Sequence, residues 1–180
     1  MGMWLAHATI LGGWALAEQG EREAGIAEMR RGITAFRATG CVYLIPFYLG
    51  LLAEHYGKIG RTERGLTLVA ASPAAVERTG ERWYEAELFR RRGELLLSRD
   101  DAVEAETAFH RALGIARYQA AKAMELRVAT SLARLWQRQA RYADGRQLLE
   151  QTCAWFDDDL ATSDLINARS VLAVCRELSA

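Results

Sequence analysis

Small side chains recur every forty residues along this chain, and this period limits the folds open to it more than any other feature. Positions 13, 53, 93, 133 and 173 hold Gly, Ala, Gly, Ala and Ala. Large side chains follow three residues later, because positions 16, 56, 96 and 136 hold Leu, Tyr, Leu and Trp. Small residues are needed where helices touch, and large ones fill the space beside them. The period indicates a row of similar helical units, each of which buries its apolar face against the next.

A second pair of columns keeps the same register later in each unit. Positions 25, 65, 105 and 145 hold Gly, Gly, Ala and Gly, and positions 29, 69, 109 and 149 hold Met, Val, Phe and Leu. Two helices per unit, each with small and large residues at fixed places, form the tetratricopeptide pattern, whose usual period is about 34 residues. We expect the extra residues of this longer period to lie mainly in the second helix of each unit.

Turn residues mark the helix ends. Gly20 and Gly60 stand between the two helices of a unit, and Gly40 and Gly80 stand between units. Glycine at these places suits the left-handed conformation that ends many helices. Non-glycine residues fill the equivalent places later in the chain, namely Asp100, Ala120 and Ala140. The sequence predicts nine helices, at residues 3–19, 22–39, 43–59, 62–78, 82–98, 101–118, 121–139, 142–156 and 163–178.

Three local signals sharpen these boundaries. Asp101 and Glu104 are spaced as a capping pair at a helix start. Pro46 is expected in the first turn of the third helix, or to kink it. Pro73 is expected to bend or break the fourth helix after Ser72, because an interior proline removes one backbone hydrogen bond and clashes with the preceding turn.

The predicted fold is therefore all-α. We expect a right-handed superhelix of about four tetratricopeptide-like (TPR-like) hairpins at residues 1–40, 41–80, 81–120 and 121–160, with a capping helix in 161–180. A chain of 180 residues, 51% of them hydrophobic, suffices for one domain with a core and is short for two.

Composition excludes several classes of partner. Lys plus Arg is 23 and Asp plus Glu is 23, so no net field attracts nucleic acid or an anionic membrane. The longest apolar run, 41–53, is too short to span a bilayer. The first residues lack the basic start of a signal peptide. Cys41, Cys153 and Cys175 fit neither a disulfide framework nor a zinc motif, and are expected to be buried free thiols in a reducing compartment. These features favour a cytoplasmic protein.

Motifs for catalysis or for metal and cofactor binding are not recognisable. The segment from Gly50 to Lys58 has the wrong spacing for a phosphate-binding loop, and Ile59 follows where Ser or Thr is needed. The three histidines, at positions 7, 55 and 110, are far apart and lack a second ligand in a metal-binding pattern. The acidic run 157–159, with Asp164, lacks the alternating oxygen ligands of a calcium loop. We expect a non-catalytic chain without cofactor or metal.

The inner wall of such a solenoid, lined by the first helix of each unit, is the candidate binding surface. It is apolar and aromatic at the N-terminal end, where Trp14 and Phe47 either anchor a partner or are covered by another domain. It is charged at the C-terminal end, where Glu87 and Arg127, and likewise Glu94 and Arg134, are forty residues apart and are predicted to pair between neighbouring helices. The predicted partner-binding residues are His7, Ile10, Trp14, Phe47, Glu54, Glu87, Arg90, Glu94, Arg127, Thr130, Arg134 and Gln137.

Several segments resemble a known family of tails. They are Gly80–Leu97, Ala105–Arg117, Ala121–Trp136, and Trp155-Phe156 followed by Thr162, Asp164 and Leu165. Together they resemble the C-terminal helical-repeat tail of large bacterial proteins that join a class III adenylate/guanylate cyclase domain, or a DNA-binding domain, to a STAND-type ATPase. The resemblance covers most of residues 45–178 and implies a regulatory tail. Residues 70–73 and the acidic run 157–159 depart from the family pattern, and neither the cyclase aspartates nor the ATPase phosphate loop is present.

The sequence thus predicts an interaction module whose concave face binds a protein segment or a neighbouring domain. Two alternatives stay open. One is a small-molecule sensing module of a transcriptional activator. The other is a module for homo-oligomerisation, because the first helix carries Trp4, Ile10 and Trp14 and no preceding repeat covers it.

Overall fold

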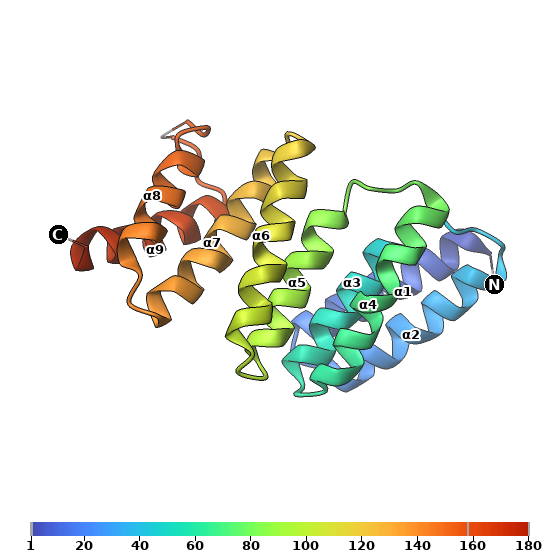
Figure 1. Cartoon of the computed structure of the whole chain (residues 1–180). Coiled ribbons are helices and arrows are strands. Elements are labelled where there is room, and N and C mark those ends of the chain that lie inside the picture. The colour runs from blue at the N-terminus through green and yellow to red at the C-terminus, as the bar shows by residue number, and fades with distance from the viewer. Residues whose placement is uncertain (1, 158, 180) are drawn as a thin grey trace.

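A computed structural model describes residues 2–157 and 159–179, in which all regular structure is helical (Figure 1). Of the acidic run 157–159, Asp158 lies outside the described residues. The predicted all-α architecture is confirmed, and the nine helices of the described chain lie within about three residues of their predicted ends. They are α1 (Met3–Glu18), α2 (Arg22–Ala38), α3 (Ile45–Lys58), α4 (Thr62–Thr79), α5 (Glu85–Leu97), α6 (Ala102–Tyr118), α7 (Lys122–Arg138), α8 (Tyr142–Cys153) and α9 (Ser163–Leu178).

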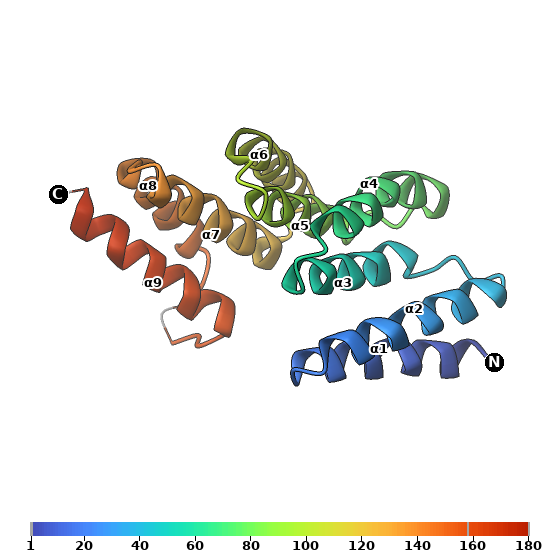
Figure 2. The ribbon, with the colours of Figure 1, turned by 90° about the horizontal axis from the view of Figure 1, so that it is seen from below.

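The helices stack as a row of hairpins, α1/α2, α3/α4, α5/α6 and α7/α8, followed by α9 (Figure 2). Each first helix after α1 also packs on the second helix of the preceding hairpin and on the preceding first helix. Apart from the exposed Ala173, the small-residue columns lie where helices cross. A Cβ on Gly25 would come within 2.4 Å of the carbonyl oxygen of Gly13, and one on Gly93 within 2.4 Å of the Phe109 ring. Close approach of the helices therefore explains the forty-residue period.

The turns follow the predicted pattern. The backbone is left-handed every twenty residues, at Gly20, Gly40, Gly60, Gly80, Asp100, Ala120 and Ala140. In the first three hairpins the second helix is longer than the first, as expected, whereas α8 has 12 residues and α7 has 17. The connection from α8 to α9 is therefore longer than the connections between the earlier hairpins.

Two of the three local predictions are confirmed. Pro46 lies in the first turn of α3, and the Asp101 carboxylate accepts a hydrogen bond of 3.2 Å from the backbone N–H of Glu104. The sequence predicts that Pro73 bends or breaks the helix, and the break is wrong, because α4 continues to Thr79. The Ser72 hydroxyl, buried beside the proline, donates to the Leu68 carbonyl at 2.9 Å. Burial of Ala75 and Val76 beyond the proline holds the last turn of the helix in place.

Two further features complete the fold. Cys41, Cys153 and Cys175 are free thiols, of which Cys175 is buried and the others are half-buried. Within the described part of the chain, every helix is too short or too polar to cross a bilayer.

Candidate binding surface on the inner wall

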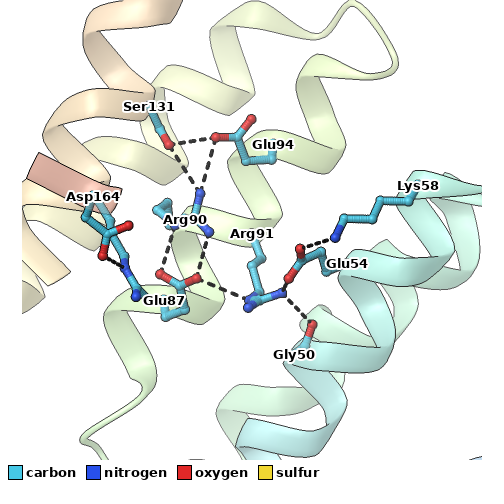
Figure 3. Close-up of polar contacts among 10 residues, drawn as sticks. Gly50, Glu54, Lys58, Glu87, Arg90, Arg91, Glu94, Ser131 and Asp164 are labelled. Carbon is cyan, nitrogen blue, oxygen red and sulfur yellow. Dashed lines mark hydrogen bonds and ion pairs between the residues drawn. The ribbon is translucent and has the colours of Figure 1, made fainter. Parts of the chain in front are cut away.

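A polar pocket of about 250 Å³ opens on the wall formed by α3, α5, α7 and α9. Six of the predicted residues come together in its lining, namely Glu54, Glu87, Arg90, Arg127, Thr130 and Arg134. Four lining residues were not predicted, namely Arg91, Ser131, Asp164 and Asn167. Figure 3 shows how several of these side chains meet between the helices.

The centre of this pocket is a buried carboxylate held by two arginines of its own helix. Glu87 is only 1% exposed. Its two oxygens accept hydrogen bonds from Nη2 and Nε of Arg90, at 2.6 and 2.8 Å. The Nε atom of Arg91 lies 3.3 Å from the same carboxylate. A bidentate pair of this kind fixes the conformation of both side chains, so Glu87 and Arg90 form a rigid base, or floor, of the pocket.

Arg91 joins this floor to the preceding hairpin. Its Nη1 atom donates to the Glu54 carboxylate and, at 3.3 Å, to the Gly50 carbonyl, both of which belong to α3. Glu54 also pairs with Lys58 at 2.8 Å. The network therefore crosses from α3 to α5 (Figure 3).

The predicted pairing of Glu87 with Arg127 and of Glu94 with Arg134 is wrong. Arg127 instead donates from Nε to Asp164 of α9 at 2.6 Å, and Glu94 accepts from the Ser131 hydroxyl at 2.6 Å. Both contacts join residues 37 apart, as does the pair of Arg91 with Glu54. The contact register is therefore about one helical turn shorter than the forty-residue sequence period.

Asp164 also stabilises the charged form of Arg127. Burial of the guanidinium opposes its charge, but the hydrogen bond to Asp164 and the attraction of that carboxylate prevail and raise the pKa of Arg127 above its ordinary value. The guanidinium of Arg127 is therefore already engaged by a carboxylate of the chain itself.

Arg134 differs from the other charged residues of the pocket. Glu54, Glu87, Arg90, Arg91, Arg127 and Asp164 all have ionic partners. Arg134 is exposed, and within the described chain no hydrogen bond or ion pair engages it. Asn167, on the opposite side in α9, has no hydrogen-bond partner there either. The pocket thus offers one open guanidinium and one open amide.

Thr130 and Gln137 serve the structure of the wall. The Thr130 hydroxyl donates to the Leu126 carbonyl at 2.7 Å. The amide of Gln137 donates to the Val171 carbonyl of α9 at 3.0 Å. These contacts occupy their donors, so neither residue is free to bind a partner through them.

The N-terminal end of the wall is aromatic, but it differs from the predicted arrangement. Ile10 is fully buried against α2, so its prediction as a wall residue is wrong. Trp14 is 39% exposed, and Phe47 packs on Trp83 and Tyr84, with ring centroids 5.7 and 5.0 Å apart. Trp83, which lies before α5, was not predicted as a wall residue. The one sequence feature that could have indicated it is that Trp83 stands forty residues after another aromatic residue, Tyr43.

His7 is tied to this aromatic end. Its Nδ1 atom lies within hydrogen-bonding distance of the Tyr48 hydroxyl. Burial raises the pKa of Tyr48 to about 12, and the protonated hydroxyl can donate to the ring. The two side chains link α1 to α3.

Among the residues that the structure describes, no three His, Cys, Asp or Glu side chains are grouped so as to hold a metal ion.

No family model matches the chain. It is 32% identical over 132 residues to the uncharacterised protein R02095 of Rhizobium meliloti (strain 1021), a match that covers 72% of this chain and 13% of that protein. The chain thus spans only a small part of the length of this relative.

Solved structures of TPR-like repeats superpose on nearly the whole chain. A putative kinesin light chain from Podosopora anserina with nearly identical TPR-like repeats has a TM-score of 0.73 at 14% identity, covering 99% of this chain and 88% of that one. BtubC (BKLC) from P. vanneervenii has a TM-score of 0.72 at 14% identity, covering 98% and 82%. At this identity the likeness shows that the chain is a TPR-like helical stack.

Proposed function

We propose that this chain is a non-catalytic interaction module whose inner wall binds a protein segment. The observation that carries the proposal is the exposed guanidinium of Arg134, which lacks an ionic partner among the described residues although every other charged side chain of the pocket has one. An exposed arginine beside a rigid, already satisfied network is ready to bind a ligand without breaking a contact.

The chemistry of the wall specifies the segment. A carboxylate of the partner would pair with Arg134 and accept from the Asn167 amide, on either side of the pocket. Toward the N-terminal end, the half-buried Phe47 and the exposed Trp83 offer aromatic surface to an apolar side chain. We infer an extended segment with an acidic end at α7 and α9 and an apolar end at α3.

The setting that we propose is a bacterial signalling protein in the cytoplasm. The resemblance to cyclase and STAND-ATPase tails suggests it, and the low share of R02095 that the chain matches is consistent with a part of a larger protein. The segment would then belong to a neighbouring domain or to another protein under its control.

The test is selection from a peptide library displayed on phage, with this chain as bait. Peptides with a carboxylate should be enriched, and their binding should be lost with Arg134→Glu and kept with Arg138→Glu, which changes a charge on the same helix outside the pocket. Because Arg134 holds no side chain of the described chain, the melting temperature should not change. Failure to enrich peptides, or equal binding to Arg134→Glu, would contradict the proposal.

A second candidate is small-molecule sensing, which one observation favours. A groove of about 540 Å³ on the opposite side, the outer groove, lies between α4, α5 and α6. Its volume is within the usual range of ligand pockets, and its lining includes Leu66, Val69, Pro73, Leu88 and Phe89. A screen of apolar ligands by thermal shift would test this function. Ala70→Trp, which fills the groove, should abolish a shift that Ala71→Trp, outside the lining, leaves intact.

A further inference from the structure

The outer groove between α4, α5 and α6 lies where two apolar side chains of the repeat are replaced. Positions 52, 132 and 172 hold buried leucines, but the equivalent residue of α5 is Arg92, which is half-buried. Positions 33 and 113 hold buried Ile and Leu, but the equivalent residue of α4 is Pro73. Between the first two hairpins, and between the last two, the residues of these columns belong to one apolar core cluster. The groove thus occupies space that aliphatic side chains fill elsewhere in the stack.

The lining of the outer groove combines an apolar floor with charged side chains. The floor includes Val69, Leu88 and Phe89, all of which are buried. The charged residues of the lining are three arginines and two glutamates, namely Arg92, Arg99, Arg111, Glu63 and Glu85. The lining is therefore net positive, and it favours an anion over a cation.

Arg111 of α6 differs from the other two arginines of this groove. Arg99 and Arg92 have carboxylate partners at 3.0 and 3.8 Å. Arg111 is exposed, and within the described chain no hydrogen bond or ion pair engages it. Its guanidinium carbon lies 4.1 Å from the centroid of the Phe89 ring. Stacking on a ring uses the face of a guanidinium and leaves the N–H donors in its plane available. Arg111 therefore offers open donors directly beside the apolar floor.

We propose that the outer groove binds a small amphipathic carboxylate, with its hydrocarbon chain on the floor and its carboxylate paired with Arg111. The hydrocarbon chain takes the place of the aliphatic side chains that fill the other joints. The carboxylate accepts two parallel hydrogen bonds from the guanidinium. A single negative charge fits best, because a second one would face Glu63 and Glu85 without an unpaired arginine to match it. This inference rests on the small-molecule function proposed for the groove and is independent of peptide binding on the inner wall.

Calorimetric titration of the whole chain at neutral pH with three ligands of one chain length tests the proposal. Octanoate carries the carboxylate, octan-1-ol lacks the charge, and octylammonium reverses it. Octanoate should bind about tenfold more tightly than octan-1-ol, as expected for hydrogen bonds to a charged group. Octylammonium should bind most weakly, because the lining is net positive.

Variants of the chain locate the binding site. Arg111→Gln should weaken octanoate about tenfold and leave octan-1-ol unchanged, which also shows that the variant is folded. The matched control Arg78→Gln changes an exposed arginine of α4 outside the lining and should leave both affinities intact. Ala70→Trp, which fills the groove, should abolish the binding of both ligands.

Two kinds of failure can be told apart. If octanoate and octan-1-ol bind equally, or if Arg111→Gln leaves octanoate unchanged, the role of the carboxylate is overturned while the groove remains a site for apolar ligands. If neither ligand binds, or if binding survives Ala70→Trp, both this inference and the small-molecule function of the groove are overturned.

Discussion

Alanine adopts the left-handed backbone conformation at two of the turns, with φ of 52° at Ala120 and 58° at Ala140. This conformation brings the Cβ of an L-residue close to the following carbonyl and costs about 1 kcal/mol. Glycine avoids the contact, and earlier turns of the chain use it. We expect Ala140→Gly to raise the free energy of unfolding by about 1 kcal/mol, even though glycine also gains entropy in the unfolded chain.

Thermal denaturation would measure this effect. The comparison is Ala71→Gly, at an exposed position inside α4, which should lower stability by about 1 kcal/mol because the helix interior disfavours glycine. If both substitutions destabilise equally, the left-handed turn carries no cost.

Because His55 is buried, we expect the folded chain to lose stability in acid. Its ring is fully buried, and neither nitrogen has a hydrogen-bond partner among the described residues. Burial lowers the pKa of His55 below its ordinary value of 6.5, Lys58 and Arg22 lower it further, and Glu18, whose carboxylate is 3.5 Å from Nε2, opposes them. The unfolded chain therefore binds a proton more readily than the folded chain, so stability falls as the pH drops below 6.5.

The slope should reach at most about 1.4 kcal/mol per pH unit. Urea denaturation of the wild type and of His55→Leu at pH values on both sides of 6.5 would measure it. The variant should show the flatter dependence below that pH. Identical slopes for the two proteins would mean that His55 does not titrate on unfolding.

At the level of single residues, the sequence predicted which side chains line the inner wall more accurately than which of them contact one another. The period placed Glu54, Arg90 and Arg134 correctly in one pocket, because residues of equivalent position on stacked helices share a face. It placed Ile10 on the wall, although this side chain is fully buried. Whether a residue at the edge of the wall is exposed depends on how its helix is rotated about its own axis, which the period does not give. Asp164 and Asn167 were missed because α9 was considered a cap rather than a further first helix.

At the scale of the element, α3 depends on a residue of the next hairpin. The backbone N–H of Leu44, at the start of α3, donates to both carboxylate oxygens of Glu81, at 3.1 and 2.8 Å. Glu81 is buried, and a carboxylate at a helix N-terminus is stabilised by the helix dipole. We expect Glu81→Ala to lower the free energy of unfolding by about 2 kcal/mol, because a hydrogen bond to a charged group is lost.

Chemical denaturation would measure this loss, with two comparisons. Glu81→Gln keeps an acceptor oxygen without the charge and should lose less than the alanine variant. Glu85→Ala removes a carboxylate that pairs at 3.3 Å with an exposed arginine, and should change stability little. An alanine variant as stable as the wild type would show that the contact does not cap α3.

The helices themselves were predictable from local signals, since periodicity and turn residues act within about twenty residues. The cap of α3 was not, because its donor and acceptor are 37 residues apart and no short motif relates them. Pro73 illustrates the opposite error. Its local preference predicted a bend or a break, but the helix does not break, because the burial of Ala75 and Val76 in the packed stack holds its last turn.

Across the whole molecule, every pair of adjacent first helices is joined by polar side chains of the inner wall. Glu18 and Lys58 join α1 to α3 at 2.6 Å, Glu54 and Arg91 join α3 to α5, Glu94 and Ser131 join α5 to α7 at 2.6 Å, and Arg127 and Asp164 join α7 to α9 at 2.6 Å. The sequence predicted that such joints exist, but three of the four have a register of 37 rather than forty. That register depends on how neighbouring helices pack on one another, which a period read along the sequence does not give.

The joint between α3 and α5 is the most buried of the four, and it should control how the two halves of the stack unfold. Arg91 is 8% exposed and contacts the carboxylates of Glu54 and Glu87 from two helices. Arg91→Met keeps most of the side-chain volume but leaves Glu54 without its buried partner. Glu54 keeps Lys58 and Glu87 keeps Arg90, so the expected loss is that of hydrogen bonds to a charged group, about 2 kcal/mol.

In a stack whose units contact only their neighbours, this loss should also uncouple the halves. Hydrogen exchange followed by mass spectrometry should show α1–α4 and α7–α9 opening with one rate in the wild type and with separate rates in Arg91→Met. Arg92→Met, which removes an exposed pair with Glu104 at 3.8 Å, should leave a single rate. A variant that loses stability but still opens as one unit would show that the apolar crossings, rather than the wall network, couple the hairpins.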